Sequence, residues 1–543
     1  MAQRCRSGTI WNKLTSSVGV WSGLVFLCAL AVYARTLAPS ITWAHAGVDS
    51  GDFASAVACG GVPHPTGYPT YLLLAALFSR LPWGDYAFRL NLLSACAAAA
   101  AAAMLVRLVY DVVRSDVREA PTTATRATAL AVSAVSGGLL LAFDATLWSQ
   151  AVIAEIYALQ LGFVLAIVLL GLWAYRRNDY VAVALTFLLC GIGLGTHLSL
   201  VFVVPVLFWM LHRLLLADPA RFVVAALLPL AAGLSVYIVI PLRAVAVPPI
   251  NWGGAATWHG FWWLISAQLY RGFLFSLPLA DLPARLAAWL GILLAGLNGW
   301  GIPVSLFGWT HLLKRDPTLA TGTLAVFVLY SAYAVFYDTT DSYIYLLPAI
   351  AMLILWMAYG LYRALVAIEP YLRDSVWKRG ALCGIAVLLS VIAAPWNWSG
   401  QNLSDNTEAL DYGLQAVEAV EPDSLIIAEG DAHTFALWYV RYGLDRRQDI
   451  AVVNDALLAF DWYHIILQKH HPGIVGETDA GSGLLSLLAH NAGRRQIYFS
   501  TEPAYLPADY RTEPSGLLWR LSAIPRPPEI DSLLPGEASA PAR

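Results

Sequence analysis

The stretch GVDSGDF at residues 47–53, followed closely by PHPTGYP at residues 63–69, places two carboxylates and a histidine between two apolar regions of the chain. The apolar region before it, near residues 18–35, is long enough to cross a bilayer. Carboxylates directly beside a membrane helix are costly to place and usually have a function. The side of the membrane that holds Asp49 and Asp52 therefore decides how the rest of the sequence is interpreted.

The composition is that of a membrane protein. Of the 543 residues, 58% are hydrophobic and only 13% are charged, and apolar runs recur along about the first 395 residues. Each run approaches the roughly 20 residues that a helical crossing needs. The formal net charge of -3 gives no reason to expect a nucleic-acid partner. We therefore expect an α-helical polytopic membrane protein.

Lysines and arginines set the expected topology, because short loops rich in them stay in the cytoplasm. The eleven spans that we expect lie near residues 18–35, 88–112, 127–145, 151–174, 180–195, 198–215, 222–241, 285–310, 319–336, 342–364 and 380–395. This assignment leaves seventeen lysines and arginines in inner loops and six in the outer loops of the membrane half. The sequence thus predicts a multi-pass protein of the cell inner (cytoplasmic) membrane, with residues 47–69 and the C-terminus outside.

The apolar segment Tyr68 to Leu81 is interpreted as a surface helix, not as a span. Its length of about 14 residues is that of an interfacial or re-entrant element. A span here would reverse every later loop and place the Arg107 to Arg126 cluster outside. We expect the helix to follow a turn set by the prolines and Gly67 of residues 63–69.

The chain changes character near Trp396, after which no stretch could cross a membrane. We therefore divide it into a membrane domain, residues 1–395, and an extracytoplasmic soluble domain, residues 396–543. Within the latter, residues 424–428 and 450–453 are typical of buried strands and residues 434–442 of a helix, which predicts a small α/β fold. All six cysteines lie in the membrane half, so the soluble domain needs no oxidising machinery.

Most unusual polar residues of the membrane half fall on the outer face in this topology. They are Asp49, Asp52, His64, Arg89, Trp148, Gln150, Glu155, Tyr157, His197, Arg243, Asn251, Trp252, Asp338 and Asp341. Simple solvation would be less one-sided. This convergence is what a functional site at the membrane surface would produce.

Several motifs give the chain a specific resemblance that covers roughly residues 18–350. They are residues 49–52, 64–69, 88–95, 148–157, 195–197, 241–244 and 251–253. With them the chain resembles a polytopic domain-of-unknown-function family related to a eukaryotic protein O-mannosyltransferase, within the GT-C glycosyltransferases. Two departures stand out: the family's usual DSGE is DSGD here, and Thr66 replaces its second proline. Asp52 keeps the charge of that glutamate but has a shorter reach, so the resemblance favours Asp49 over Asp52 as the base.

The resemblance implies a GT-C fold of about eleven transmembrane helices plus juxtamembrane helices, and a site that takes a sugar, for example mannose, from a polyprenyl phosphate. Partners would be that lipid-linked sugar, the bilayer and a protein or glycan acceptor. Asp49 is the candidate general base with Asp52 in support, and Arg243 suits the phosphate. The candidate substrate-binding residues are His64, Tyr68, Arg89, Glu155, Tyr157, His197, Arg243, Asn251 and Trp252. The reaction would be inverting, on the extracytoplasmic side.

Metal dependence stays open at this point. Asp49 and Asp52, with Asp338 or Glu155, could gather around Mg²⁺ or Mn²⁺, because hard cations prefer oxygen ligands. No spacing in the sequence requires such an ion, and the resembling transferases include metal-dependent and metal-independent members. No metal ligand is therefore assigned.

Structural roles compete with the functional ones. Asp49 could cap a helix over Ser50 to Cys59, with Asp52 completing a capping box. Glu155 could interact favourably with the dipole at a helix start, and His197 could be a core histidine whose hydrogen bonds are all made. Arg243 could anchor a helix at the level of the lipid head groups. For Asp338 and Asp341 we favour ordinary loop solvation.

At the level of the whole protein, a transporter or flippase of a lipid-linked or small polar substrate is the alternative. Such proteins tend to have inverted repeats and polar groups at the bilayer midplane. No clear internal repeat is present, and the polar residues gather at one face. A non-catalytic scaffold would leave the outer cluster unexplained. The favoured hypothesis is a transferase whose C-terminal domain binds the acceptor.

Overall fold

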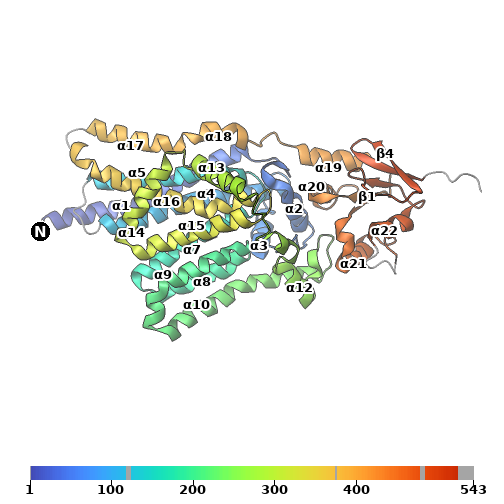
Figure 1. Ribbon diagram of the computed structural model, residues 1–543, viewed down its shortest axis with the longest axis horizontal. Helices are drawn as coiled ribbons and strands as arrows, with labels where there is room; N and C mark the ends of the chain where they lie inside the picture. Colours follow the sequence, from blue (N-terminus) through green and yellow to red (C-terminus); the bar gives the residue numbers. More distant parts are fainter. Residues whose placement is uncertain (1, 118–123, 373–375, 477–482, 524–543) are drawn as a thin grey trace, which may run out of the picture.

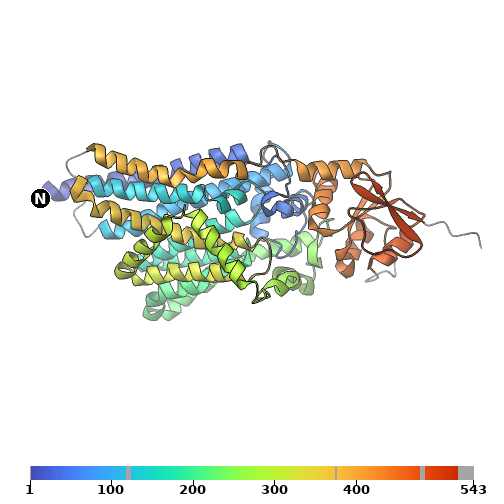
Figure 2. The same ribbon diagram turned by 45° about the horizontal axis from the view of Figure 1, so that its top comes forward.

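The computed structural model describes residues 2–117, 124–372, 376–476 and 483–523. Long helices run side by side through most of the molecule, and a small domain with a β-sheet lies at the end opposite the N-terminus (Figure 1). Short helices fill the zone between the bundle and this domain, and the turned view shows the same order (Figure 2). The C-terminal domain thus sits on one end of a helical bundle.

Eight helical segments of the described chain are long and apolar enough to cross a membrane. They are Val18–Thr36 of α1 (Ala2–Thr36), α4 (Tyr86–Val117), α7 (Tyr157–Arg177), η2 with α9 (Leu198–Ala217), α10 to α11 (Pro219–Ala244), α15 (Pro317–Phe336), η6 with α16 (Ser342–Ala367), and α17 with α18 (Gly380–Gln401). Two bent helix pairs raise the number to ten if each pair is one span. The protein is a multi-pass membrane protein.

The helical polytopic class is confirmed, and the structure departs from the eleven expected spans in three places. The pair α5 (Ala124–Ala142) and α6 (Ala145–Ala151) bends by 61°, and the pair α13 (Leu282–Gly296) and α14 (Gly301–Arg315) bends by 87°. The span expected at residues 180–195 is α8 (Tyr180–Leu194), an apolar helix of only 15 residues. Hydropathy finds apolar runs but cannot detect where a helix breaks or stops short.

The short apolar helix expected near residues 68–81 is confirmed as a helix below spanning length. It is α3 (Pro69–Phe78), and its first residue is a proline, which is favoured at the first helical position. It follows α2 (Ser50–Ala58), which bears the acidic motif. Both lie between the bundle and the C-terminal domain (Figure 1).

The C-terminal domain is the small α/β fold that the sequence predicts. Its sheet has the order β2-β1-β3-β5-β4, with parallel pairing of β1 to β2 and β3 and antiparallel pairing of β5 to β3 and β4. The strands are β1 (Leu425–Ala428), β2 (Ala451–Asn454), β3 (Ile497–Phe499), β4 (Tyr510–Ser515) and β5 (Leu518–Ala523). The helices are α19 (Glu408–Glu418), α20 (Gly430–Trp438), α21 (Asp461–His470) and α22 (Gly483–Asn491). The expected boundary at residue 395 falls within α18 (Ala393–Gln401).

The C-terminal domain packs directly onto the segment that opened the sequence analysis. A Cβ atom on Gly51 of α2 would lie only 2.5 Å from the backbone oxygen of Phe435 in α20, so the two helices approach as closely as glycine allows. Buried Val62, Ile240 and Trp252 share one apolar core with the strands of the domain. The connection between α1 and α4, which contains residues 47–69, is called the first loop below. The first loop and the C-terminal domain therefore form one packed unit.

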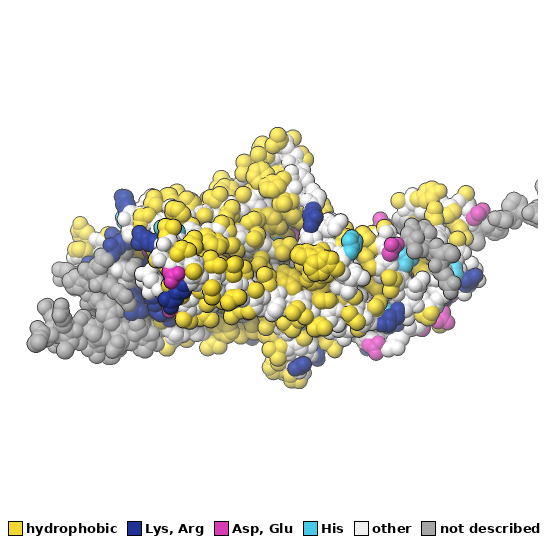
Figure 3. Space-filling view, turned by 90° about the horizontal axis from the view of Figure 1, so that it is seen from below, with side chains coloured by type: hydrophobic (Ala, Val, Ile, Leu, Met, Phe, Trp, Pro, Cys, Tyr) yellow, Lys and Arg dark blue, Asp and Glu magenta, His cyan; other side chains and the backbone are white. Residues whose placement is uncertain are grey.

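The surface chemistry changes along the long axis of the molecule (Figure 3). Lys and Arg gather near the end that carries the N-terminus, and a broad hydrophobic surface lies between that end and the C-terminal domain. Exposed Leu27, Leu216 and Leu228 contribute to this apolar surface. Such a belt is the expected face of a protein surrounded by lipid.

Candidate functional site

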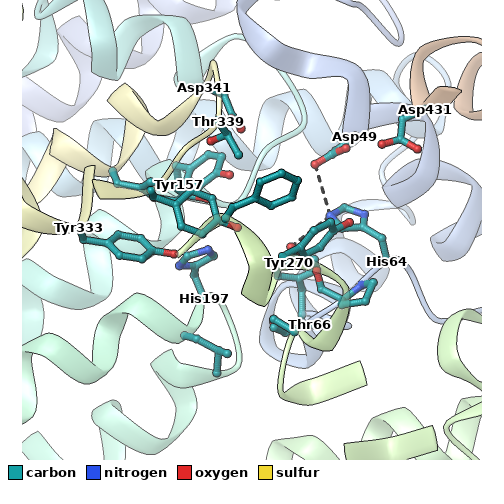
Figure 4. A pocket seen from close by; sticks show the side chains of 17 residues that line it. Asp49, His64, Thr66, Tyr157, His197, Tyr270, Tyr333, Thr339, Asp341 and Asp431 are labelled. Carbon is teal, nitrogen blue, oxygen red and sulfur yellow. Dashed lines mark hydrogen bonds and ion pairs between the residues drawn. The ribbon is translucent and has the colours of Figure 1, made fainter. Parts of the chain in front are cut away.

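A cavity of about 270 Å³ lies where the bundle, the first loop and the C-terminal domain meet. Asp49, His64 and Asp431 lie on one side of it, and Tyr157, Tyr333 and His197 on the other (Figure 4). The remaining lining residues are Pro65, Thr66, Tyr68, Leu198, Ala267, Tyr270, Phe273, Tyr337, Thr339, Asp341 and Tyr345. An acidic wall thus faces a wall of hydroxyl groups.

The backbone around Asp49 presents its carboxylate to the cavity. Asp49 ends η1 (Ala44–Asp49), in which His45 and Ala46 both have positive φ values, and directly precedes α2. Its side chain makes no capping hydrogen bond to α2 and is 34% exposed. The alternative in which Asp49 acts only as a helix cap is therefore not what the structure shows.

His64 bridges the two acids of the motif. Its Nδ1 donates to Oδ2 of Asp52 at 2.8 Å, and its Nε2 lies 3.3 Å from Oδ2 of Asp49. The hydroxyl of Tyr68 donates to the backbone oxygen of Pro65 at 2.9 Å, so its oxygen can accept from Nε2 of His64 at 3.1 Å. This arrangement uses both ring nitrogens as donors, as in a protonated histidine.

Asp52 is a buried support for His64 and has no contact with the cavity. Its Oδ2 also accepts from the backbone nitrogen of His64 at 2.9 Å, and its Oδ1 accepts from Nε1 of Trp252 at 3.2 Å. The residue is fully buried. The sequence grouped Asp52 with Asp49 as catalytic and Trp252 with the substrate-binding residues, whereas the structure places both behind His64.

Charge on Asp49 and His64 is set by burial and by their mutual attraction. Burial raises the pKa of Asp49 to about 6, although the nearby His64 opposes the shift. For His64, burial alone would lower the pKa, but Asp49 and Asp52 outweigh it and raise the pKa to about 9. At neutral pH the pair is therefore an ionised carboxylate beside an imidazolium.

His197 stands on the opposite wall as a neutral group. Its Nδ1 accepts from the backbone nitrogen of Ser199 at 3.2 Å, and burial lowers its pKa to about 4. The proton of the neutral ring is consequently on Nε2, which is a hydrogen-bond donor. The rings of Tyr157 and Tyr345 lie 5.9 and 5.3 Å from the imidazole. His197 lines the cavity and is more than a core residue.

Both arginines expected at the site lie elsewhere. Arg243 donates to the backbone oxygen of Gly61 at 3.1 Å and does not line the cavity. Arg89 holds the loop after α3 by donating to the backbone oxygens of Ser79, Trp83 and Gly84. Their guanidinium groups bind backbone oxygens and neither lines this cavity, so a role of Arg243 toward a phosphate stays a prediction.

Two further candidates are buried outside the cavity wall. Asn251 donates from Nδ2 to the backbone oxygen of Ala244 at 3.2 Å and forms a β-bridge with Val62. Glu155 is buried, and its Oε1 has no partner among the described residues. Burial, followed by the charge of Asp49, raises the pKa of Glu155 well above its usual value. Glu155 is thus a buried acid behind the cavity wall, where burial favours its protonated form.

The structure adds residues that the sequence did not single out. The most informative is Asp431, in the first turn of α20 directly after strand β1. Its place after the carboxyl end of a parallel strand, where ligands often bind, was a usable signal. Asp341, interpreted as loop solvation, instead lines the cavity, whereas Asp338 pairs with Arg285 at 3.1 Å.

Metal-ligand geometry is not present in the described part of the chain. Within it, no three His, Cys, Asp or Glu side chains converge closely enough to hold an ion. Asp49, Asp341 and Asp431 face one cavity but do not form such a set.

Two family models match two separate segments of the chain. The N-terminal domain of protein O-mannosyl-transferase TMEM260 matches residues 49–216, and TMEM260-associated domain 2 matches residues 409–471. The chain is related to the TMEM260 O-mannosyl-transferases. The two matches include Asp49 and His64 in the first segment and Asp431 in the second, so both segments that build the acidic side of the cavity are similar to TMEM260.

Comparison with curated relatives agrees with this relation. The mouse protein O-mannosyl-transferase TMEM260 is 25% identical over 83% of this chain and 64% of its own length. The corresponding Dictyostelium discoideum protein is 21% identical over 91% of this chain and 65% of its own length. The chain thus spans slightly less than two thirds of these two TMEM260 relatives.

Solved structures show the fold. ArnT from Cupriavidus metallidurans, bound to undecaprenyl phosphate, superposes with a TM-score of 0.52 at 14% identity, over 92% of this chain and 97% of ArnT. The apo oligosaccharyltransferase of Archaeoglobus fulgidus gives 0.50 at 11% identity, over 83% of this chain and 68% of that protein. The TMEM260-related chain therefore has the GT-C fold.

Proposed function

We propose that the protein is a membrane glycosyltransferase that moves a sugar, with mannose the favoured one, from a polyprenyl phosphate to an acceptor hydroxyl. The acceptor would be a Ser or Thr of a protein or a hydroxyl of a glycan, outside the cytoplasmic membrane. The observation that carries the proposal is the Asp49–His64 ion pair on the wall of a cavity between bundle and C-terminal domain. A carboxylate held in this way is a suitable base for a hydroxyl group.

The proposed reaction is a single displacement at the anomeric carbon of the sugar. Asp49 takes the proton of the acceptor hydroxyl while that oxygen attacks the anomeric carbon of the sugar. The bond from this carbon to the phosphate oxygen breaks, and the polyprenyl phosphate leaves with the electron pair. Attack from the side opposite to the leaving phosphate inverts the anomeric centre. His64 keeps Asp49 ionised and oriented, and Asp52 fixes His64 from behind.

The phosphate in this proposal is bound by neutral donors. None of the described residues that line the cavity is a lysine or an arginine. Tyr157, Tyr333 and His197 lie on the wall away from Asp49, and the ring of Tyr345 lies 5.3 Å from that of His197. This wall offers tyrosine hydroxyl groups and the Nε2 donor of His197. Several such donors can together stabilise the charge that develops on a departing phosphate. We therefore place the phosphate on the tyrosine side and the acceptor on the acidic side.

The relatives support the class of reaction. The mouse and Dictyostelium proteins are named as protein O-mannosyl-transferases, and ArnT, which has the same fold, is bound to undecaprenyl phosphate. The concentration of lysines and arginines at the far end of the bundle supports an extracytoplasmic cavity, since positively charged ends stay inside.

A transfer assay tests the proposal directly. The full chain in lipid nanodiscs would receive polyprenyl-phosphate mannose with a radioactive sugar and a peptide that contains Ser and Thr. We expect labelled peptide, with the anomeric configuration in the product opposite to that in the donor by NMR. Retained configuration would exclude the single-step mechanism. Movement of intact donor across a sealed vesicle membrane, without any transfer, would favour the transporter instead.

The rate of transfer should have a bell-shaped dependence on pH. Asp49 must be ionised to accept a proton, so the rate should fall as the pH drops through about 6. His64 must be protonated to hold Asp49, so the rate should also fall as the pH rises through about 9. Initial rates at saturating donor between pH 4.5 and 10.5 would show both limbs. A rate that is flat from pH 5 to 7 would contradict Asp49 as the base.

A further inference from the structure

Among the described residues of the C-terminal domain, Asp431 is the one charged group that lines the cavity. It lies in the first turn of α20 and is exposed. In the described part of the chain its carboxylate has no hydrogen-bond or ion-pair partner. Figure 4 shows it beside Asp49, with its oxygens directed toward the same space. A free carboxylate in this place can bind a group that enters from the aqueous side.

The position of Asp431 relative to Asp49 is fixed by contacts on both sides. Nε1 of Trp43, next to η1, donates to the backbone oxygen of Ala432 at 3.1 Å. The ring of Phe435 stacks on His64 with centroids 6.3 Å apart and planes 17° apart. Together with the close approach at Gly51, these contacts join the first turn of α20 to the loop that carries the base. The domain is therefore built into the wall of the cavity.

Two routes lead to this cavity in a membrane enzyme. A polyprenyl chain stays in the bilayer, so its sugar arrives from the bundle, whose residues Tyr157 and Tyr333 form the opposite wall. An acceptor that is not anchored in lipid arrives from the water, past the C-terminal domain. Asp431 lies on that second route.

The charged groups of the cavity wall are mostly negative. Asp49, Asp341 and Asp431 line the cavity with a single imidazolium, His64, and with no Lys or Arg among the described lining residues. Such a surface attracts positively charged ligands and repels negatively charged ones. Charge complementarity of this kind contributes more to the choice between ligands than to the affinity for any one of them. An acidic acceptor segment would be disfavoured.

We propose that the C-terminal domain forms the acceptor side of the active site and that Asp431 selects polypeptide acceptors with a basic residue beside the accepting Ser or Thr. This inference rests on the proposed function for the identity of the acceptor. It assigns a role in specificity to the C-terminal domain. Along the chain, this domain is connected to the first loop only through the helices of the bundle.

Binding of matched peptides tests the inference apart from catalysis. Three fluorescent peptides would differ only in the residues beside one Thr, which would be Lys, Ala or Glu. Anisotropy titrations would use the full chain in uncharged phosphatidylcholine nanodiscs at low salt. We expect the Lys peptide to bind about fivefold more tightly than the Glu peptide. Asp431→Asn should remove most of this ratio, and Asp431→Lys should reverse it.

Glu418→Gln is the matched control, because Glu418 is an exposed acid of the same domain that does not line the cavity. It should keep the wild-type ratio. Binding of polyprenyl-phosphate mannose, measured in every variant, should not change, and this reports that the folded site persists. The ratio should also shrink as salt is added, since exposed charges are screened.

The outcomes separate the two proposals. An unchanged ratio in Asp431→Asn, or no peptide binding by the wild-type chain, would overturn the role of Asp431. If the wild-type chain shows the expected preference and Asp431→Asn loses it, but no sugar is ever transferred, the inference stands as a docking preference and the proposed function fails.

Discussion

Asp49→Asn should lower the rate of sugar transfer about 10³-fold, the central value for loss of a general base. Asparagine has the shape of aspartate but cannot take the proton of an acceptor hydroxyl at neutral pH. Donor affinity should be retained, because the proposed phosphate contacts lie on the tyrosine wall. Single-turnover rates with preloaded donor would isolate the chemical step from product release.

The control for this variant is Asp281→Asn. Asp281 is an exposed acid at the start of α13, makes no capping hydrogen bond and does not line the cavity. It should transfer sugar at the wild-type rate. If Asp49→Asn keeps a tenth or more of the wild-type rate, another group must accept the proton, and Asp431 would be the first to test.

Asp52→Ala should be the most destabilising single change at the site. The carboxylate accepts from the backbone nitrogen of His64, from its Nδ1 and from Nε1 of Trp252, and it is fully buried. Alanine leaves all three donors buried without an acceptor and His64 without its counter-charge. Breaking a buried ion pair in this way costs about 3–5 kcal/mol. Reversible unfolding by SDS titration would measure the loss.

A change in the pH profile distinguishes this effect from simple unfolding. Without Asp52, the carboxylate that helps to raise the pKa of His64 is gone, so the alkaline limb should move below about 9 in the molecules that remain folded. Ser55→Ala is the control on the same helix, because it removes one buried hydrogen bond, to the backbone oxygen of Gly51 at 2.6 Å. It should cost about 1 kcal/mol and leave the alkaline limb in place. A stable Asp52→Ala with an unmoved limb would contradict this account of His64.

The sequence predicted those features that depend on local pattern. Apolar runs located most of the spans, and length together with the positions of lysines and arginines separated the short helix α3 from them. Alternating burial cannot be seen in β1 and β2, yet compact apolar runs bounded by polar residues were enough to find both strands. Asp49, His64 and His197 were chosen from the motifs and do line one cavity.

What the sequence could not supply depends on long-range packing. Asp431 reaches Asp49 only because α20 docks on α2 at Gly51, and no local pattern reports that contact. Arg243 lies in the last turn of α11 (Val239–Ala244), where its side chain could have turned either way. The β-bridge between Val62 and Asn251 holds the backbone oxygen of Gly61 near Arg243. The guanidinium of Arg243 donates a hydrogen bond to that oxygen.

The fit of Gly51 against Phe435 limits how such chains can be recombined. A chimera that takes its outer domain from one relative and its first loop from another would bring together surfaces that never matched, with no spare volume at the glycine to absorb the difference. The two segments recognised by separate family models, residues 49–216 and 409–471, meet at this contact. They are distant in sequence but packed against each other in the fold, so we expect a change in one surface to require a matching change in the other.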